Sequence, residues 1–118
     1  MEFNASIPIY LQVIESIKKD IVSGKLELGA RLPSTREMAL EKKINANTAA
    51  RIYKELEYLN IAYTKRGIGT FITESKDTYK QIKKELSESY IESFVMNMKG
   101  LGYLKPEVVD LVKEYKER

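Results

Sequence analysis

The residues best suited to chemistry lie in the middle of the chain, on one face of a helix that Asn45 is placed to begin. They are polar, cationic or small and recur at helical spacing: Asn47, Ala50, Arg51 and Lys54. An asparagine amide and an arginine guanidinium can each form paired hydrogen bonds with a base edge, and a lysine ammonium attracts phosphate. The pattern is typical of a helix that contacts duplex DNA, although an ordinary amphipathic helix with a solvated face shows the same spacing.

Other kinds of site chemistry have little support. The chain has no cysteine and no histidine, which removes thiol and imidazole catalysis, zinc–thiolate sites and disulfide bonds. It also has no glycine-rich loop of the kind that cradles nucleotide phosphates. Glu85, Glu88 and Glu92 lie at helical spacing among Lys83 and Lys84, as on a solvated face. We therefore expect a protein that is not an enzyme and that needs no metal or cofactor.

Size and charge set further bounds. At 118 residues the chain can hold one domain, or a small domain with an appendage. Its net charge of +3 comes from residues 1–72, where eleven lysines and arginines face eight acids, whereas residues 73–118 hold nine of each. So small an imbalance is compatible with a polyanionic partner without demanding one. No apolar run suits a signal peptide or a membrane span, so a cytoplasmic protein without a membrane partner is expected.

Three predicted helices position the polar face. After a loose start at residues 1–6, apolar residues repeat at three- and four-residue steps through residues 8–24. Ser34 and Glu37 have the spacing of a capping box and begin a second helix. The third helix begins at Asn45 and has an apolar stripe opposite its polar face: Ala49, Ile52, Tyr53, Leu56 and Leu59. The second and third helices, joined by a tight turn, form a predicted helix-turn-helix.

A β-hairpin is predicted directly after the third helix. Residues 61–64 and 70–73 are rich in β-branched and aromatic side chains. The turn between them is basic and glycine-rich: Lys65, Arg66, Gly67, Ile68 and Gly69. Three helices followed by a basic hairpin is the order of a winged helix-turn-helix. Such a tip suits phosphates or a minor groove, although it would also serve merely to close a turn and keep an edge soluble.

The rest of the chain reads as two helices with a wide apolar face. Gly100 and Gly102 separate the two, and Pro106 begins the second. The apolar face comprises Tyr79, Ile82, Leu86, Tyr90, Phe94 and Met98, then Val108, Leu111, Val112 and Tyr115. Two helices alone cannot bury such a face, so we expect it to form a dimer interface. Packing within one chain, or a pocket for a small-molecule effector, remains an alternative.

Several motifs together resemble a known family. The first part of the chain contains Pro8-Ile9-Tyr10-x-Gln12-Val13, Gly24-Lys25-Leu26 and Gly29-x-x-Leu32-Pro33-Ser34-x-Arg36-Glu37. Asn45-x-Asn47-Thr48, Arg51-x-Tyr53, Leu56-Glu57 and Gly67-x-Gly69-Thr70-Phe71 follow in order. Over about residues 8–72 this series resembles the GntR family of bacterial transcription regulators.

The resemblance implies a winged-helix DNA-binding domain followed by a variable C-terminal domain. The residues after 72 are too few for the large ligand-binding or aminotransferase-like domains of most branches. They are similar to the YtrA-like branch, whose short helical tail serves dimerisation. The expected fold is thus mostly α with a small β-hairpin. Residues 1–73 would form a winged helix-turn-helix domain, and residues 74–118 a helical dimerisation tail.

The resemblance also implies roles for particular residues. Arg36 matches a family position that contacts DNA, and Arg51 is the best candidate for a guanine or phosphate contact. Ser34 is expected to cap its helix, and Thr48 either to cap the third helix or to contact DNA. The full set of expected DNA-binding residues is Ser34, Arg36, Asn45, Asn47, Thr48, Arg51, Lys54, Lys65, Arg66, Gly67 and Gly69.

Some positions depart from the family pattern. Lys42 stands where an apolar residue is expected, and Lys43 where glycine is common. Asn60 replaces the usual glycine after the third helix, and asparagine also tolerates the left-handed conformation. Ala46 and Ala50 occupy positions where some relatives carry arginine, so base contacts cannot be carried over there.

The expected function is a dimeric, sequence-specific DNA-binding regulator that recognises an inverted repeat. Repression by promoter occlusion is favoured over activation. The alternatives are a winged-helix module that binds another protein and a receptor for a small ligand.

Overall fold

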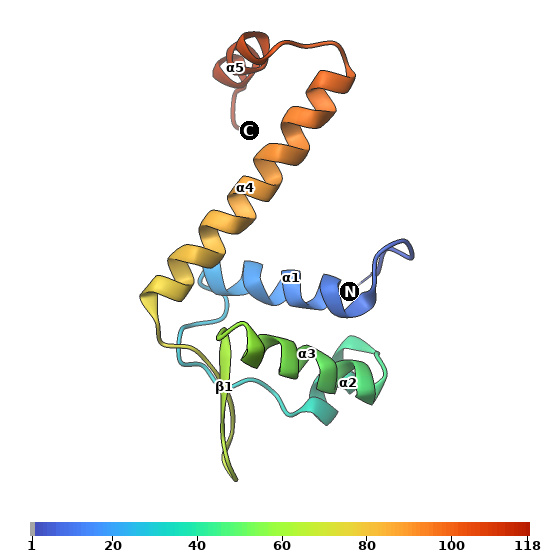
Figure 1. Ribbon diagram of the computed structural model, residues 1–118, viewed down its shortest axis with the longest axis vertical. Helices are drawn as coiled ribbons and strands as arrows, with labels where there is room; N and C mark the ends of the chain where they lie inside the picture. The colour runs from blue at the N-terminus through green and yellow to red at the C-terminus, as the bar shows by residue number, and fades with distance from the viewer. Residues whose placement is uncertain (1) are drawn as a thin grey trace. The chain divides into compact units, whose positions relative to one another are not determined.

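The computed structural model describes residues 2–118 and shows a mostly helical chain with one two-stranded antiparallel hairpin (Figure 1). The elements are α1 (Ile9–Val22), α2 (Thr35–Lys42), α3 (Ala46–Tyr58), β1 (Ala62–Lys65), β2 (Gly69–Ile72), α4 (Lys76–Gly100) and α5 (Lys105–Glu114). Their order confirms the fold class predicted from the sequence.

The chain forms two compact units, residues 1–82 and 83–118. This division falls later than the expected boundary after residue 73, because the first turns of α4 belong to the first unit. There the Tyr79 hydroxyl donates a hydrogen bond to the carbonyl oxygen of Val22 at 2.9 Å, and the Ile82 side chain is buried. These two residues were expected in a dimer interface. They instead lie against the chain's own first unit, since α4 begins directly after β2.

The core of the first unit is built around α3, which contacts α1, α2 and β1. The predicted apolar stripe of α3 is largely buried, and four of its members have a relative exposure of 5% or less: Ala49, Ile52, Tyr53 and Leu56. Leu59 does not belong to it. It is 39% exposed, because α3 ends at Tyr58 and Leu59 already forms the C-cap. Helix α1 supplies the facing surface with Val13, Ile14, Ile17 and Ile21.

The turn between α2 and α3 gives the helix-turn-helix its geometry. Lys43 has φ +56 and ψ +50 and forms the C-cap of α2 in the left-handed conformation. Glycine adopts this conformation without strain, which agrees with the family's preference for glycine there. Asn60, after α3, has φ +59, so asparagine does take the left-handed position that was expected of it.

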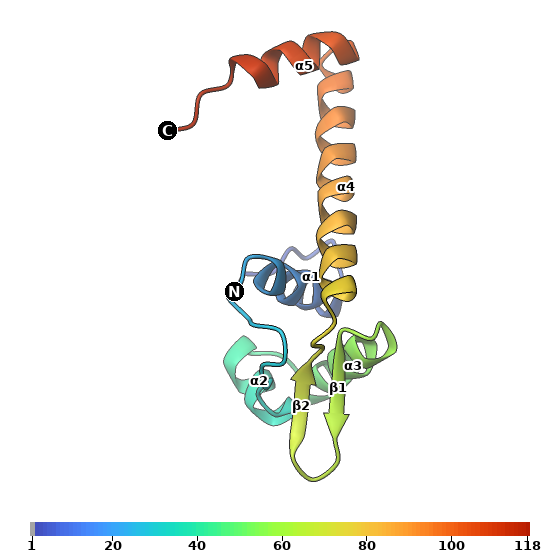
Figure 2. The same cartoon turned by 90° about the vertical axis from the view of Figure 1, so that its left-hand side faces the viewer.

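The hairpin pairs Ala62 with Ile72 at its base and Lys65 with Gly69 at its tip (Figure 2). A third segment joins its edge. The Leu32 N–H donates to the Thr70 carbonyl and the Ile72 N–H donates to the Ala30 carbonyl, both at 2.8 Å. The hairpin, residues 62–72, is called the wing below.

The segment before α1 is not the loose start that was expected. The Gln12 side chain accepts a hydrogen bond from the Asn4 N–H and donates to the carbonyl oxygens of Asn4 and Ile7, all at 2.7–2.8 Å. The Asn4 side chain in turn accepts from the backbone and hydroxyl of Ser6. One glutamine in the first turns of α1 thus anchors the residues that precede the helix.

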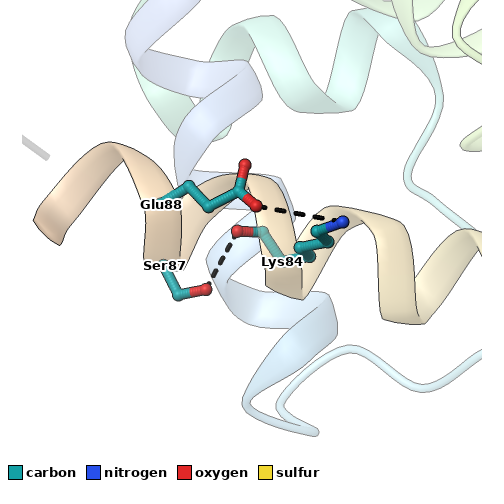
Figure 3. Close-up of polar contacts among 3 residues, drawn as sticks. All are labelled: Lys84, Ser87 and Glu88. Carbon is teal, nitrogen blue, oxygen red and sulfur yellow. Dashed lines mark hydrogen bonds and ion pairs between the residues drawn. The ribbon is translucent and has the colours of Figure 1, made fainter. Parts of the chain in front are cut away.

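The polar face of α4 carries local contacts between neighbouring turns. Figure 3 shows Lys84 and Glu88 in an ion pair at 3.9 Å, with the Ser87 hydroxyl donating to the Lys84 carbonyl oxygen at 2.9 Å. Both charged side chains are largely exposed. This face of α4 is therefore a solvated surface, as the charge pattern predicted. Exposed ion pairs of this kind add little stability to the fold.

Candidate nucleic-acid interface

Helix α3 presents the predicted polar face to solvent. The side chains of Asn47, Arg51 and Lys54 are exposed, one or two turns apart along the helix. Asn45 caps the helix: its side-chain oxygen accepts a hydrogen bond from the Asn47 N–H at 2.7 Å. Thr48 takes no part in this cap and lies half-buried. The cap occupies the Asn45 side-chain oxygen but leaves the side chain of Asn47 free to meet a ligand.

Tyr53 ties α3 to the segment before α2. Its ring is buried on the inner side of α3, and its hydroxyl donates a hydrogen bond to the Pro33 carbonyl oxygen. Burial, followed by the nearby Glu41 and Glu37 carboxylates, raises the pKa of Tyr53 to about 12. Because Pro33 directly precedes the cap of α2, this bond fixes the two helices of the motif to each other.

The guanidinium of Arg51 lies over the ring of Tyr10, which comes from the first turn of α1. The central carbon of the guanidinium is 3.7 Å from the ring centroid. Within the described residues the Arg51 side chain forms no hydrogen bond or ion pair. The contact with Tyr10 is of the cation–π type, and within the described residues it leaves the N–H donors of Arg51 without a hydrogen-bond partner.

The first turn of α2 brings Ser34 and Arg36 to the surface. The Ser34 hydroxyl accepts from the Glu37 N–H at 3.1 Å, and the Glu37 carboxylate accepts from the Ser34 N–H at 3.0 Å, which confirms the predicted capping box. Hydrogen bonding of the Glu37 carboxylate to the Ser34 backbone N–H, and then to the Ser34 side chain, lowers the pKa of Glu37, and the charge of Arg31 assists. Ser34 thus acts as a cap, and its N–H is already occupied. Arg36 is exposed.

Two aromatic rings of the wing lie beside its lysine. Tyr63 and Phe71 stack across the two strands with centroids 5.8 Å apart, and the Lys65 ammonium lies 5.1 Å from the Phe71 ring centroid. Arg66 and Gly67 occupy the exposed tip, where Gly67 has φ +78. The wing thus displays Lys65 and Arg66 as the sequence predicted, with Lys65 held against the rings.

Thr64 links the wing to α3. Its hydroxyl donates to the carboxylate of Glu57 on α3 and lies 3.0 Å from the Thr70 hydroxyl on the opposite strand. The wing is therefore hydrogen-bonded to the last turns of α3, the helix that carries the polar face.

Arg31 is a cation of this surface that the sequence analysis missed. It pairs with Phe71 as an isolated β-bridge, and its guanidinium lies over Gly69. A Cβ atom on Gly69 would come within 2.8 Å of the Arg31 Nε. A side chain at position 69 would therefore displace the Arg31 guanidinium from its present place. The sequence held no clear signal for this, because a paired segment as short as Ala30–Leu32 has no recognisable strand pattern.

Over the residues that the structure describes, the cations of the surface are not held in ion pairs. Among residues 2–118, none of Arg31, Arg36, Arg51, Lys54, Lys65 or Arg66 forms an ion pair with a carboxylate. Exposed cations without acidic partners keep their charge available to an anion. In the same described part of the chain, no group of acidic side chains is arranged to hold a metal ion. None of its helices combines the length and apolar character needed to cross a membrane.

In the second unit, the predicted apolar face is divided. Val108 is buried and lines an apolar groove with Ile91, Phe94 and Val95. A second groove of about 280 Å³ is formed by Phe94, Met98, Leu111, Val112 and Tyr115. Large parts of the face remain open, with Tyr90, Phe94, Val112 and Tyr115 all exposed by more than 40%.

Three packed helices, a polar third-helix face and a basic wing together define a winged helix-turn-helix DNA-binding protein. The model of the family described as bacterial regulatory proteins, gntR family, matches residues 9–72. The chain belongs to this family, and it is a DNA-binding transcriptional regulator rather than an enzyme.

Two relatives from Bacillus subtilis match nearly the whole chain. The HTH-type transcriptional regulator YhcF is 42% identical over 98% of this chain and 96% of its own length. The HTH-type transcriptional repressor YtrA is 33% identical over 93% of this chain and 85% of its own length. Both alignments extend beyond the winged helix into the C-terminal helices.

Solved structures agree with these matches. A GntR family transcriptional regulator from Listeria monocytogenes has a TM-score of 0.87 and 37% identity, covering 97% of this chain and 100% of its own. The DNA-binding domain of AraR, solved in complex with operator ORX1, has a TM-score of 0.53 and 27% identity, over 57% of this chain and 81% of its own. The first shares the fold along nearly the entire chain, and the second is a related domain seen on DNA.

Proposed function

We propose that this protein is a homodimeric, sequence-specific repressor that binds an inverted-repeat operator and blocks a promoter. The observation that carries the proposal is the exposed polar face of α3 with the wing bonded to the same helix, whose cations form no ion pair with a carboxylate among residues 2–118. A helix of this kind enters a major groove, and a basic wing meets phosphates or the neighbouring minor groove.

Each residue of this surface has a distinct role in the proposal. Asn47 and Arg51 read base edges, since both present paired donors or donor–acceptor groups. Arg36 and Lys54 contact phosphates, and Lys65 and Arg66 do the same from the wing. Ser34 and Asn45 act indirectly by capping α2 and α3. Gly67 and Gly69 shape the wing.

The open apolar face of the second unit supports a dimer. Its exposed members are large, and they are contiguous along α4 and α5. Monomeric proteins rarely leave such a face in water, and a symmetric pair would present two recognition helices to two half-sites. Repression, rather than activation, is favoured because the similar YtrA is named a repressor.

The test is binding of duplex DNA from the region upstream of the protein's own gene, measured by fluorescence anisotropy at low and moderate salt. Wild type is compared with Arg51→Ala, Arg36→Ala and, as a control, Lys84→Ala on the solvated face of α4. We expect wild type to bind the upstream duplex more tightly than random duplex. Arg51→Ala should lose about 1–3 kcal/mol of binding free energy, and the control should bind with unchanged affinity. Arg36→Ala should weaken both duplexes alike and lower the salt dependence.

One result would change the DNA substrate, and another would count against the proposal. Weak, salt-sensitive and equal binding to every duplex would mean that this DNA holds no operator, and a randomised library would then be the next substrate. A folded dimer that binds no duplex even from the library would favour a protein-interaction module.

A further inference from the structure

We propose that Tyr10 is a positioning residue for DNA recognition: it holds the guanidinium of Arg51 by its flat face so that the edge of that group is presented to a base. The inference deepens the proposed function and rests on it. It assigns a role in sequence recognition to helix α1, which lies outside the helix-turn-helix.

The geometry of the pair carries the argument. The central carbon of the Arg51 guanidinium lies over the Tyr10 ring, 3.7 Å from its centroid, which is well within the range of a cation–π contact. The Arg51 side chain makes no other polar contact within the described residues. A guanidinium carries all its N–H donors in its own plane, so a ring against its face leaves those donors unhindered.

Tyr10 is itself placed on a rigid support. It lies in the first turn of α1, whose next residues on the inner side, Val13 and Ile14, are buried in the core. Gln12, two residues further, anchors the segment that precedes the helix through three hydrogen bonds. The Tyr10 ring is half-buried. Packing therefore limits the movement of the ring, and the ring in turn can restrict Arg51.

Restricting a long side chain before binding removes part of the entropy cost of ordering it on DNA. Immobilising one such side chain changes affinity by about two- to tenfold. The gain applies only where Arg51 makes an oriented contact, so it should appear with the recognised sequence and not with random DNA. The ring supplies the effect, so the Tyr10 hydroxyl is dispensable.

The experiment uses the full chain and a duplex enriched from a randomised library by the wild-type protein. Dissociation constants for this duplex and for a scrambled one are measured for wild type, Tyr10→Leu, Tyr10→Phe, Arg51→Ala and the double variant Tyr10→Leu/Arg51→Ala. We expect Tyr10→Leu to weaken the selected duplex about two- to tenfold and to leave the scrambled duplex unchanged. Tyr10→Phe should bind like wild type, and Tyr10→Leu should have no effect once Arg51 is alanine.

Other outcomes would overturn the inference. If Tyr10→Leu weakens binding equally in the Arg51→Ala background, the tyrosine acts through the fold and not through Arg51. If Tyr10→Phe loses as much as Tyr10→Leu, the hydroxyl and not the ring is responsible. Leu11→Ala, at the exposed neighbouring position of α1, is the matched control, and circular dichroism checks that each variant folds.

Arg51→Lys keeps the proposal testable if Tyr10→Leu fails to fold. Lysine retains the charge but has no flat face to stack, so this variant should lose affinity for the selected duplex and not for the scrambled one. Equal affinity of Arg51→Lys and wild type for the selected duplex would contradict the inference. A wild-type protein that enriches no sequence at all would instead overturn the proposed function, and the two failures are therefore distinguishable.

Discussion

The hydroxyl of Tyr53, in the middle of α3, donates a hydrogen bond to the carbonyl oxygen of Pro33, 20 residues earlier in the chain. The bond joins the recognition helix to the segment that leads into α2, so it helps to set the angle between the two helices. Tyr53→Phe keeps the buried ring but leaves the carbonyl without this donor. We expect a loss of about 1–2 kcal/mol in the free energy of unfolding, measured by urea denaturation. An unchanged urea midpoint would show that water replaces the hydroxyl at no cost.

The same tyrosine makes stability sensitive to alkaline pH. Its pKa is raised to about 12 in the folded protein, so between pH 10 and 12 the unfolded chain releases this proton and the folded chain retains it. The contribution of this group to stability is complete below pH 10 and is lost as the pH rises through the pKa of Tyr53 in the folded protein. The free energy of unfolding should fall by roughly 2–3 kcal/mol over this interval. Wild type should therefore lose more stability than Tyr53→Phe over this interval. Parallel pH profiles of the two proteins would contradict the raised pKa.

The capping box of α2 should be measurable in the same way. Ser34→Ala removes the hydroxyl that accepts from the Glu37 N–H, and we expect a cost of about 1 kcal/mol. The lowered pKa of Glu37 adds stability that is present at pH values above the ordinary pKa of a glutamate. This stability is lost as the pH falls through the pKa of Glu37 in the folded protein. Glu37→Gln, which cannot ionise, should flatten that acid dependence. An acid profile identical to wild type would assign the effect to other carboxylates.

A side chain at Gly69 should displace the Arg31 guanidinium, an effect that a side chain at Gly67 does not share. An added Cβ at Gly69 would meet the Arg31 Nε at 2.8 Å, whereas a Cβ at Gly67 meets nothing within 4 Å. Both have positive φ, +78 at Gly67 and +154 at Gly69, so Gly67→Ala is a comparison variant that also carries backbone strain but does not touch Arg31. Gly69→Ala should lower DNA affinity further than Gly67→Ala, because it also displaces the Arg31 guanidinium. In an Arg31→Ala background the extra loss of DNA affinity caused by Gly69→Ala should shrink, because the displaced guanidinium is no longer there.

The dimer is tested by a charge on the apolar face. Phe94, 42% exposed, lines both grooves of the second unit. Phe94→Asp should raise the dimer dissociation constant at least about tenfold, because it removes a large apolar contact and buries a charge. Ser89→Asp introduces the same charge on a different, exposed part of α4 and should leave the dimer dissociation constant unchanged. Sedimentation equilibrium measures both, and a dimer that tolerates Phe94→Asp would place the interface elsewhere.

Much of the fold follows from patterns within short stretches of sequence. The capping box of Ser34 and Glu37 and the cap at Asn45 are contacts between residues two or three positions apart, so their spacing alone predicts them. The apolar stripe of α3 and the basic turn of the wing are equally local. Because helical spacing also decides which side chains share a face, the polar surface of Asn47, Arg51 and Lys54 was predictable without coordinates.

Other relationships arise only when distant segments fold together. Nothing in the spacing of Tyr10 and Arg51, or of Arg31 and Gly69, indicates that they touch, because each pair joins elements that meet only through the shared core. The same holds for Tyr79 and Ile82. Their periodicity matches the rest of α4, but its first turns pack on the first unit, so the stripe divides between two surroundings. The helices, their caps and the chemistry of the exposed face thus depend on near neighbours along the chain, and spacing predicts them. Which cations are held, and by which residues, depends instead on how the helices and the wing pack, so local patterns do not reveal it.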